Sequence, residues 1–438
     1  MARGMVNEGA ASGAPVYGRD DVEEIQRRTV RVLLTSQASG GVGLVATYIV
    51  TALLAKDLTG SKPLATVAAA FLSVGSAVAA FPLARMASTR GRRIGLRTGY
   101  LIGTCGAGVA LLAAITRSYP LLCLGVLGAG AGNAANLATR YAASDLAAEE
   151  RRARTISVIV WATVIGSTAG SVVSGAASDI GEKLGLPAKG GSYLLSGLMF
   201  LLAAAIVEFK LRPDPLEVAQ GLGRMSSASP VEKPRARESL SLIWSNPAAR
   251  LAVAAMVVSQ VTMVGVMSLT PLHMDDGGHS QGLIGMMMAF HIWGMYLFSP
   301  LVGSLTDRFG QYPMLYLSGG LCTWGAVWAA VTPPEGVLGV FMGNFLIGMG
   351  WSFGVVAASS LIVAQFPIEQ RVGVQGVGDL AMIGSGAVAG VSSGALYTLF
   401  GYDGVNFGNA AFGILLLVAT MGTFLLVRRQ EPALVTTG

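Results

Sequence analysis

The stretch Gly303–Gly310 reads GSLTDRFG and lies between two long apolar segments of the chain. A weaker copy, ARMASTRG, occupies Ala84–Gly91, 219 residues upstream, and it also separates two apolar segments. A charged turn that occurs once in each half of a chain, between apolar segments each time, indicates two related halves. We therefore expect two homologous bundles of membrane-spanning helices.

The composition indicates a membrane protein independently of this repeat. Hydrophobic residues make up 53% of the chain and charged residues 12%, whereas a soluble domain has about 25% charged residues. A helix needs about 20 apolar residues to cross the hydrocarbon layer. We predict an all-α polytopic membrane protein with twelve transmembrane helices in two pseudo-symmetric six-helix bundles, the spans being residues 30–55, 62–84, 94–116, 119–141, 155–178, 191–210, 248–274, 281–304, 312–332, 336–364, 372–400 and 404–427.

The polar stretches divide the chain into four parts. Residues 212–246 are rich in Pro, Ser and charge, which is typical of a linker between domains. The predicted parts are an N-terminal segment (1–29), an N-terminal six-helix bundle (30–211), the linker (212–246) and a C-terminal six-helix bundle (247–438).

The positions of Lys and Arg predict the orientation in the membrane. With the N-terminus inside, 25 of the 30 Lys and Arg residues fall in cytoplasmic segments, in agreement with the positive-inside rule. We expect a multi-pass protein of a bacterial cytoplasmic membrane, with both termini and the linker in the cytoplasm. The net charge of +6 then reflects topology and contact with the lipid bilayer, and no nucleic-acid partner is expected.

The repeated loop resembles the loop signature of the major facilitator superfamily, in which Gly is followed by an acidic residue and Arg, and then by Gly and basic residues. In the C-terminal half the matching residues are Gly303, Asp307, Arg308 and Gly310, and in the N-terminal half they are Gly91, Arg92 and Arg93. The resemblance implies secondary transport by two bundles that rock around a central site.

Ser88 and Thr89 stand where the family has the acid and Arg of the first loop. In the family, this acid caps a helix end in the opposite half and stabilises one conformation. The resemblance therefore implies a weaker or differently built latch in this chain.

A second resemblance concerns the direction of transport. Gly166, Gly170 and Gly175 are similar to the antiporter pattern in which Gly-Pro and further glycines kink the fifth helix, but Ser171 replaces the Pro. The Arg that drug antiporters of the family carry in span four is also missing. The resemblance to antiporters is partial.

The C-terminal half has two ionisable residues well within its predicted spans, Asp379 and His291. Ionisable groups are costly in the hydrocarbon and usually functional there, so we predict that they carry protons. Two other interpretations stay open: Asp379 pairs with Arg92 or Arg93 across the two halves, and His291 is a buried residue satisfied by one hydrogen bond.

Polar residues recur at helical spacing on spans one, four, seven and ten, and we predict that they line the substrate cavity. A cluster of Met residues around Gln260 suits apolar cargo of several shapes, although Met also fills gaps in helical bundles. The cavity candidates are Gln37, Tyr48, Asn133, Asn136, Arg140, Gln260, Met263, Asn344 and Trp351.

These features predict a monomeric, proton-coupled secondary transporter that exports amphipathic or drug-like small molecules. The alternatives are a proton-coupled importer of a small polar metabolite and a membrane sensor or scaffold that transports nothing. We expect no enzyme activity, because the HExxH and kinase motifs are missing. We expect neither a cofactor nor a metal site.

Overall fold

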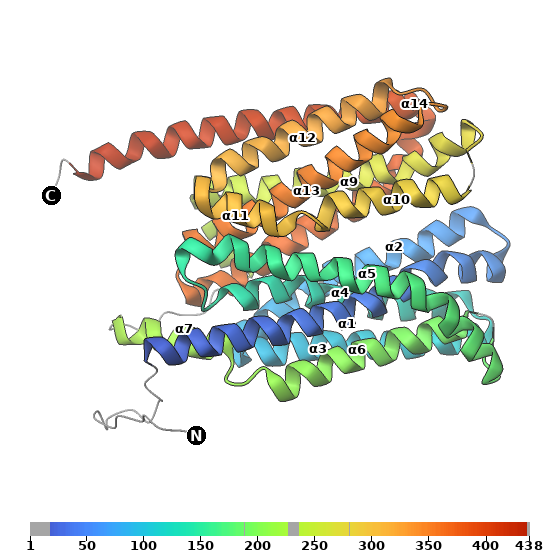
Figure 1. The fold of residues 1–438 in the computed structure, drawn as a ribbon, viewed down its shortest axis with the longest axis horizontal. Helices are drawn as coiled ribbons and strands as arrows, with labels where there is room; N and C mark the ends of the chain where they lie inside the picture. Colours follow the sequence, from blue (N-terminus) through green and yellow to red (C-terminus); the bar gives the residue numbers. More distant parts are fainter. Residues whose placement is uncertain (1–17, 188, 227–235, 280, 436–438) are drawn as a thin grey trace.

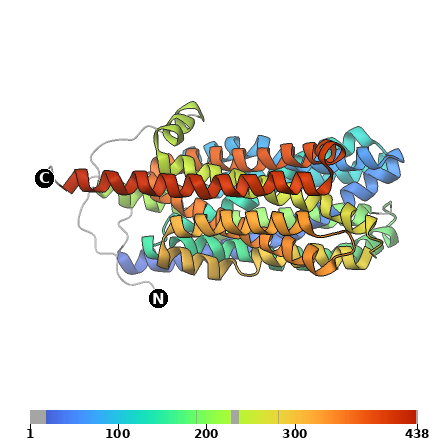
Figure 2. The same cartoon turned by 90° about the horizontal axis from the view of Figure 1, so that it is seen from above.

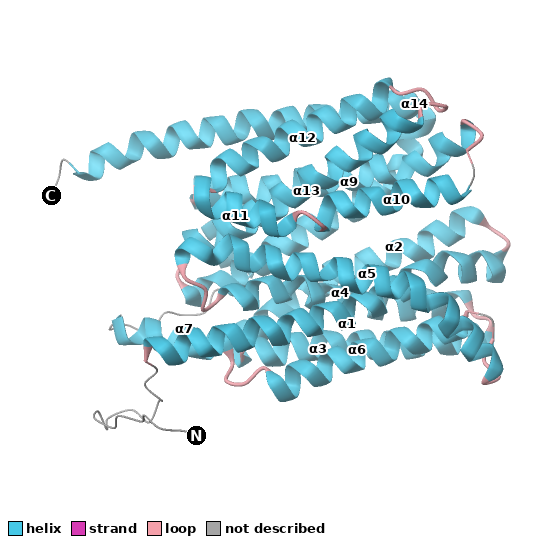
Figure 3. Ribbon diagram, viewed as in Figure 1, coloured by secondary structure: helices cyan, strands magenta, loops and turns pink. Residues whose placement is uncertain are grey.

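The computed structural model describes residues 18–187, 189–226, 236–279 and 281–435, and all regular structure in these ranges is helical (Figure 3). The elements are α1 (Arg19–Thr59), α2 (Lys62–Arg90), α3 (Arg92–Thr116), α4 (Tyr119–Ser144), η1 (Glu149–Arg151), α5 (Arg152–Lys183), α6 (Gly190–Lys210), α7 (Pro215–Ser226), α8 (Ala236–Ser245), α9 (Pro247–Asp276), α10 (Gln281–Tyr296), α11 (Ser299–Phe309), α12 (Gln311–Val331), α13 (Val337–Gln365) and α14 (Ile368–Val435).

The long helices run side by side and form two groups (Figures 1 and 2). Helices α1 to α6 make up the N-bundle, and α9 to α14 make up the C-bundle (Figure 1). The start of α1 and the end of α14 lie at the same end of the molecule (Figure 1). We call this end, which also carries the loops around Gly91 and Gly310, the basic end. The predicted all-α fold is confirmed.

Eleven helices among the described residues are long and apolar enough to span a membrane. The difference from the twelve predicted spans arises in α14, where Gly401 interrupts the helix with φ 68° and ψ −178°. Glycine adopts this left-handed conformation without steric cost. The two arms on either side of Gly401 correspond to the predicted spans 372–400 and 404–427, and the predicted span 281–304 is built from α10 and α11.

Glycines allow the helices of the N-bundle to touch backbone to backbone. A Cβ atom on Gly106 would lie 2.4 Å from the nitrogen of Ala129, and one on Gly125 would lie 2.4 Å from the nitrogen of Ala110. Small residues at such positions permit the close helix packing that is common in membranes. The interface between α3 and α4 therefore depends on the absence of side chains at these positions.

The segment between the bundles contains two short helices, α7 and α8. Residues 227–235 of the predicted linker, and most of the predicted N-terminal segment, lie outside the described residues. Helix α7 lies at the basic end, close to the start of α1 (Figure 1).

Candidate functional site

The loop acid of the C-bundle caps a helix of the N-bundle. The two carboxylate oxygens of Asp307 accept hydrogen bonds from the backbone N–H groups of Ala153 (2.9 Å) and Arg154 (2.8 Å), at the start of α5. The first N–H groups of a helix have no partner within the helix, so a carboxylate stabilises them. Asp307 thus makes the contact between halves that the family resemblance implies.

Gly303 and Gly310 of this loop are each needed for a different structural reason. A Cβ on Gly303 would lie 2.1 Å from the Oγ of Ser157 in α5, so only glycine lets α11 approach the N-bundle this closely. Gly310 has φ 87°, in the region that favours glycine, where the chain turns from α11 into α12. Arg308 is exposed and lies over the ring of Phe309.

The corresponding loop of the N-bundle is built differently. The hydroxyl of Ser88 donates to the carbonyl of Arg85 in its own helix (2.8 Å). Arg92 pairs with Asp145 through Nε–Oδ2 (2.7 Å) and Nη2–Oδ1 (3.0 Å), and it also donates to Oε1 of Gln375 in the C-bundle (2.8 Å). Polar contact between the bundles at this loop therefore comes from Arg92 and not from Ser88.

A buried ion pair joins the centres of the two bundles near the basic end. The guanidinium of Arg140 in α4 donates to the carboxylate of Asp379 in α14, and the side chains are 2% and 6% exposed. The hydroxyl of Tyr141 donates to the same carboxylate oxygen (3.2 Å), and the Nε of Arg140 donates to Ser359 (3.3 Å). We call Arg140 and Asp379 the gate pair.

The structure corrects two predictions about these residues. The alternative interpretation, in which Asp379 pairs with Arg92 or Arg93, is wrong, because Arg92 pairs with Asp145 and Arg93 pairs with Glu208 (2.7 Å). Arg140 is buried in the gate pair instead of lining a cavity. Helical periodicity placed both residues on inward faces but did not show which charges meet.

A cavity of about 20 Å³ lies beside the gate pair. Its polar lining comes from Arg92, Tyr141, Gln375 and Asp379, and the Nε2 of Gln375 is buried without a protein partner. A polar cavity of this size holds about one water molecule. The cavity gives the Asp379 carboxylate a polar neighbourhood on the side of Arg92.

The side-chain hydrogen bonds that connect the bundles in the described residues all lie toward the basic end. Besides the loop and gate contacts, Ser299 donates to the carbonyl of Ser157 (3.0 Å). Gly376 also approaches α2 closely, since a Cβ there would lie 2.4 Å from the Cβ of Ala84. The bundles are therefore joined at the basic end in this conformation.

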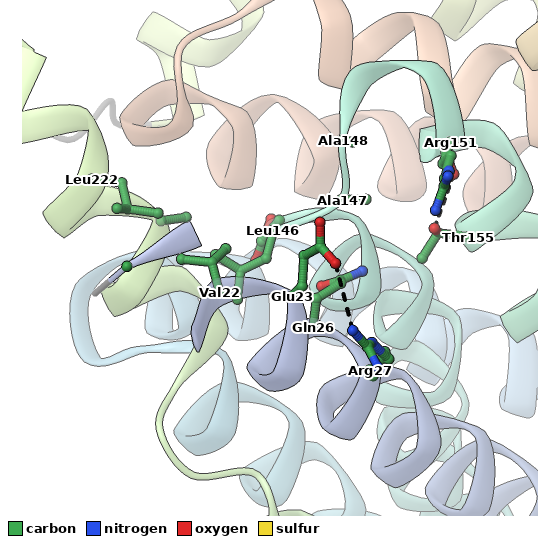
Figure 4. Close-up of a pocket in the computed structure, with 13 residues that line it drawn as sticks. Val22, Glu23, Gln26, Arg27, Leu146, Ala147, Ala148, Arg151, Thr155 and Leu222 are labelled. Atoms are coloured by element: carbon green, nitrogen blue, oxygen red, sulfur yellow. Dashed lines mark hydrogen bonds and ion pairs between the residues drawn. The ribbon is translucent and has the colours of Figure 1, made fainter. Parts of the chain in front are cut away.

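The basic end also has an open pocket of about 520 Å³ between α1, the α4–α5 connection and α7 (Figure 4). Glu23 and Arg27 pair on its wall at 3.5 Å (Figure 4). All of its lining residues belong to the N-bundle and α7. It therefore does not lie between the bundles, where a transported molecule would have to pass.

The predicted cavity residues of the N-bundle are mostly engaged with one another. The Nε2 of Gln37 donates to Thr163 (2.9 Å) and its Oε1 accepts from Thr139 (2.7 Å), while Asn136 accepts from the hydroxyl of Tyr100 (2.9 Å). Gln37 and Asn136 are 4% and 3% exposed. Asn133, half-buried, donates to Ser76 (3.0 Å).

The C-bundle candidates are also buried, except Gln260, which is half-buried. Trp351 donates to Gln260 (2.8 Å) and is 3% exposed, and Met263 is buried in the apolar core. Asn344 is fully buried and donates to Thr270 (3.3 Å) and Val340 (2.9 Å). The prediction that these side chains line an open cavity is therefore wrong for this conformation.

Two further predictions have separate outcomes. Tyr48 of α1 is 52% exposed, unlike the other candidates of the N-bundle. Gly166 and Gly170 pack against α1, since Cβ atoms there would lie 2.6 Å from the carbonyl oxygen of Ala38 and 3.0 Å from that of Val42. Helix α5 runs unbroken through these glycines, and the surroundings of Ser171 and Gly175 lie outside the described residues.

His291 lies inside the C-bundle. Its ring is fully buried, its Nδ1 lies 2.7 Å from the carbonyl oxygen of Asn344, and its Nε2 has no protein partner. This arrangement matches the interpretation of a buried His held by one hydrogen bond.

Sequence reasoning missed Tyr141, Ser359 and Asp214, which complete the contacts at the basic end. Tyr141 directly follows Arg140 in the sequence. A phenol beside a cation in a predicted span could have indicated that both side chains bind the same acid. Asp214 lies between two prolines in the sequence RPDP, the pattern of a helix start. Ser359 carried no such signal.

Two helical bundles joined by polar contacts at one end define the class of secondary membrane transporters. The chain belongs to the Major Facilitator Superfamily, whose family model matches residues 32–283 and 255–437.

Curated relatives match almost the whole chain. The chain is 33% identical over 415 residues (94% of this chain, 93% of the relative) to the uncharacterized MFS-type transporter YddS of Bacillus subtilis (strain 168). It is 28% identical over 418 residues (93% and 96%) to the riboflavin transporter RfnT of Brucella anthropi.

Solved structures show the same fold at low sequence identity. A bacterial homologue of the iron transporter ferroportin, in an outward-facing state, superposes with a TM-score of 0.70 at 15% identity and covers 91% of this chain and 99% of its own. The E. coli fucose:proton symporter FucP (N162A) has a TM-score of 0.63 at 15% identity, with 92% and 98% covered. The chain is a multi-pass membrane transporter.

Proposed function

We propose that this transporter is driven by protons and that Asp379 is the proton carrier. The observation that carries the proposal is the gate pair, which places an ionisable carboxylate at the contact between the two bundles. With the basic end in the cytoplasm, as the positive-inside rule favours, the conformation described is closed to the cytoplasm.

The gate pair connects protonation with the opening of this end. In a low-dielectric interior, an ion pair is stable only while both charges are present, and removal of one partner costs about 3–5 kcal/mol. A proton on Asp379 removes the negative charge and leaves the guanidinium of Arg140 uncompensated. Protonation of Asp379 therefore favours separation of the bundles. By thermodynamic linkage, separation of the bundles raises the affinity of Asp379 for the proton by the same factor.

For the cargo we propose amphipathic small molecules, which the protein exports in exchange for protons. Most polar candidates already bond within their own bundle, so the surface left to a ligand carries few free polar groups. Such a surface suits ligands with an apolar body and few polar atoms.

Import is the second candidate. The name of the relative RfnT gives a substrate and no direction, so it is as compatible with import as with export. Riboflavin is itself a planar ring system with a hydroxylated chain, and it fits the proposed cargo class.

Reconstituted protein distinguishes the two directions. Proteoliposomes with an imposed pH gradient are given riboflavin or a fluorescent amphipathic dye, and the substrate and the internal pH are followed together. Export by antiport predicts that substrate and protons move in opposite directions, whereas symport moves them together. Substrate movement that does not respond to the gradient contradicts proton coupling in either form.

A further inference from the structure

One carboxylate at the basic end serves the starts of two helices. Asp214 is 6% exposed, and its Oδ2 accepts the backbone N–H of Arg93 near the start of α3 (2.8 Å). Its Oδ1 accepts the backbone N–H of Leu216 near the start of α7 (3.0 Å). Each bond satisfies an N–H group that the helix itself leaves free. Asp214 therefore ties α7 to the loop of the N-bundle in which the family acid is missing.

The glycine of that loop makes room for the carboxylate. A Cβ on Gly91 would lie 2.5 Å from the Oδ2 of Asp214. Gly91 also has φ 93°, a conformation that side chains disfavour. The loop sequence and the Asp of the linker are therefore matched to each other.

The side chain of Leu216 in α7 contacts residues of both bundles. It is 1% exposed and packs in one apolar cluster with Ala87 of α2 and Val372 of α14, which are also buried. Ala84 and Ile368 lie at the edge of this cluster. Because α2 and α14 belong to different bundles, their separation would expose Leu216 to water.

We propose that Asp214 is a positioning residue that holds α7 so that Leu216 latches the basic end shut, in place of the acid absent at Ser88. The inference rests on the transport function proposed above, in which the two bundles separate at the basic end. The C-bundle loop contacts the opposite bundle with a carboxylate on a helix terminus, whereas beside the N-bundle loop a buried leucine of α7 packs against both bundles. Burial of a leucine side chain corresponds to a factor of about ten or more in an equilibrium constant, so an apolar latch is strong enough for this role.

The test measures the distance between the bundles and needs no substrate. Nitroxide labels are placed on Glu150→Cys and Ala364→Cys, two exposed positions on opposite bundles at the basic end, after replacement of Cys105, Cys123 and Cys322. Pulsed electron spin resonance then gives the populations of short and long distances. Leu216→Ala and Asp214→Ala should each raise the ratio of long to short distances about tenfold.

Three further variants distinguish a latch from a merely structural contact. Val218→Ala removes a buried side chain from the same helix, outside the Leu216 cluster, and should leave the distances unchanged. Ser88→Asp combined with Leu216→Ala should restore the short distance, because the family acid then takes over the latch. Asp214→Asn keeps one acceptor oxygen and should show a smaller shift than Asp214→Ala.

Unchanged distances in folded Leu216→Ala and Asp214→Ala overturn the proposal, as does an equal shift in Val218→Ala. If Leu216→Ala does not fold, Leu216→Val serves in its place, with a smaller expected shift. A failure of proton coupling alone leaves these distances as predicted, so the two proposals fail separately.

Discussion

The guanidinium of Arg140 and the carboxylate of Asp379 lie 239 positions apart in the chain and form a buried ion pair between the two bundles. The pair is buried near the basic end, where Tyr141 and Ser359 are its polar neighbours. Each charge therefore depends on the other. Because of this dependence, one proton bound to Asp379 would weaken the contact between the bundles.

The cost of an unpaired charge predicts the stability of variants. Arg140→Met leaves the Asp379 carboxylate buried without its cation and should lower the free energy of unfolding by about 3 kcal/mol. The double variant Arg140→Met/Asp379→Leu removes both charges and should recover most of that loss. Thermal unfolding in detergent measures both. Equal destabilisation in the single and double variants would show that the charges are not coupled.

The first loop gives a second prediction. Ser88→Asp restores the family acid near the start of α14 and should favour the conformation closed at the basic end by about 1 kcal/mol, which changes a two-state population about fivefold. Cysteine labelling at the opposite mouth would report the change. An unchanged labelling rate in normally folded protein would show that Ser88 takes no part in the switch.

His291 and Asp379 were equal candidates for the proton carrier, and their surroundings separate them. The ring of His291 bonds within the C-bundle to the carbonyl of Asn344, whereas Asp379 bonds across the two bundles. We predict that His291→Asn, whose amide can donate to the same carbonyl, retains the pH dependence of transport. A pH profile of initial transport rates in proteoliposomes checks this, and a lost pH dependence would make His291 the carrier.

Topology is a fourth prediction. With the basic end in the cytoplasm, a single cysteine at the exposed Glu150 should react with a membrane-impermeant maleimide only in inside-out vesicles. A cysteine at the exposed Lys183, near the opposite end of α5, should react only in intact cells. The reverse pattern would invert the assigned orientation and the assignment of the closed end.

The fold was predictable because span length and apolar composition are local properties. Each predicted span corresponds to a helix or a pair of helices. The predicted spans 372–400 and 404–427 are the two arms of α14 on either side of Gly401, where the backbone leaves the helical conformation.

The site was predictable only in part, because it depends on contacts between distant segments. The sequence singled out Arg140 by helical spacing, Asp379 by its position inside a predicted span and Asp307 by the loop resemblance. It could not show that Asn136 bonds to Tyr100 or that Gln260 bonds to Trp351, and such bonds take polar side chains away from the cavity. The pairing of Arg92 with Asp145 was missed for the same reason, since loop residues carry no period that fixes their partners.

The most direct test of the central claim compares two transport modes in Asp379→Asn. Asparagine keeps an oxygen that accepts from Arg140 and Tyr141 but carries no exchangeable charge. A driving force of 100 mV per proton is worth about 2.3 kcal/mol, a concentration ratio of about fiftyfold. We predict that the variant retains substrate counterflow without a gradient, while its proton-driven accumulation ratio falls to about one, whatever the size of the imposed gradient. Accumulation by Asp379→Asn at the level of the unmodified protein would contradict the assignment of Asp379 as the proton carrier.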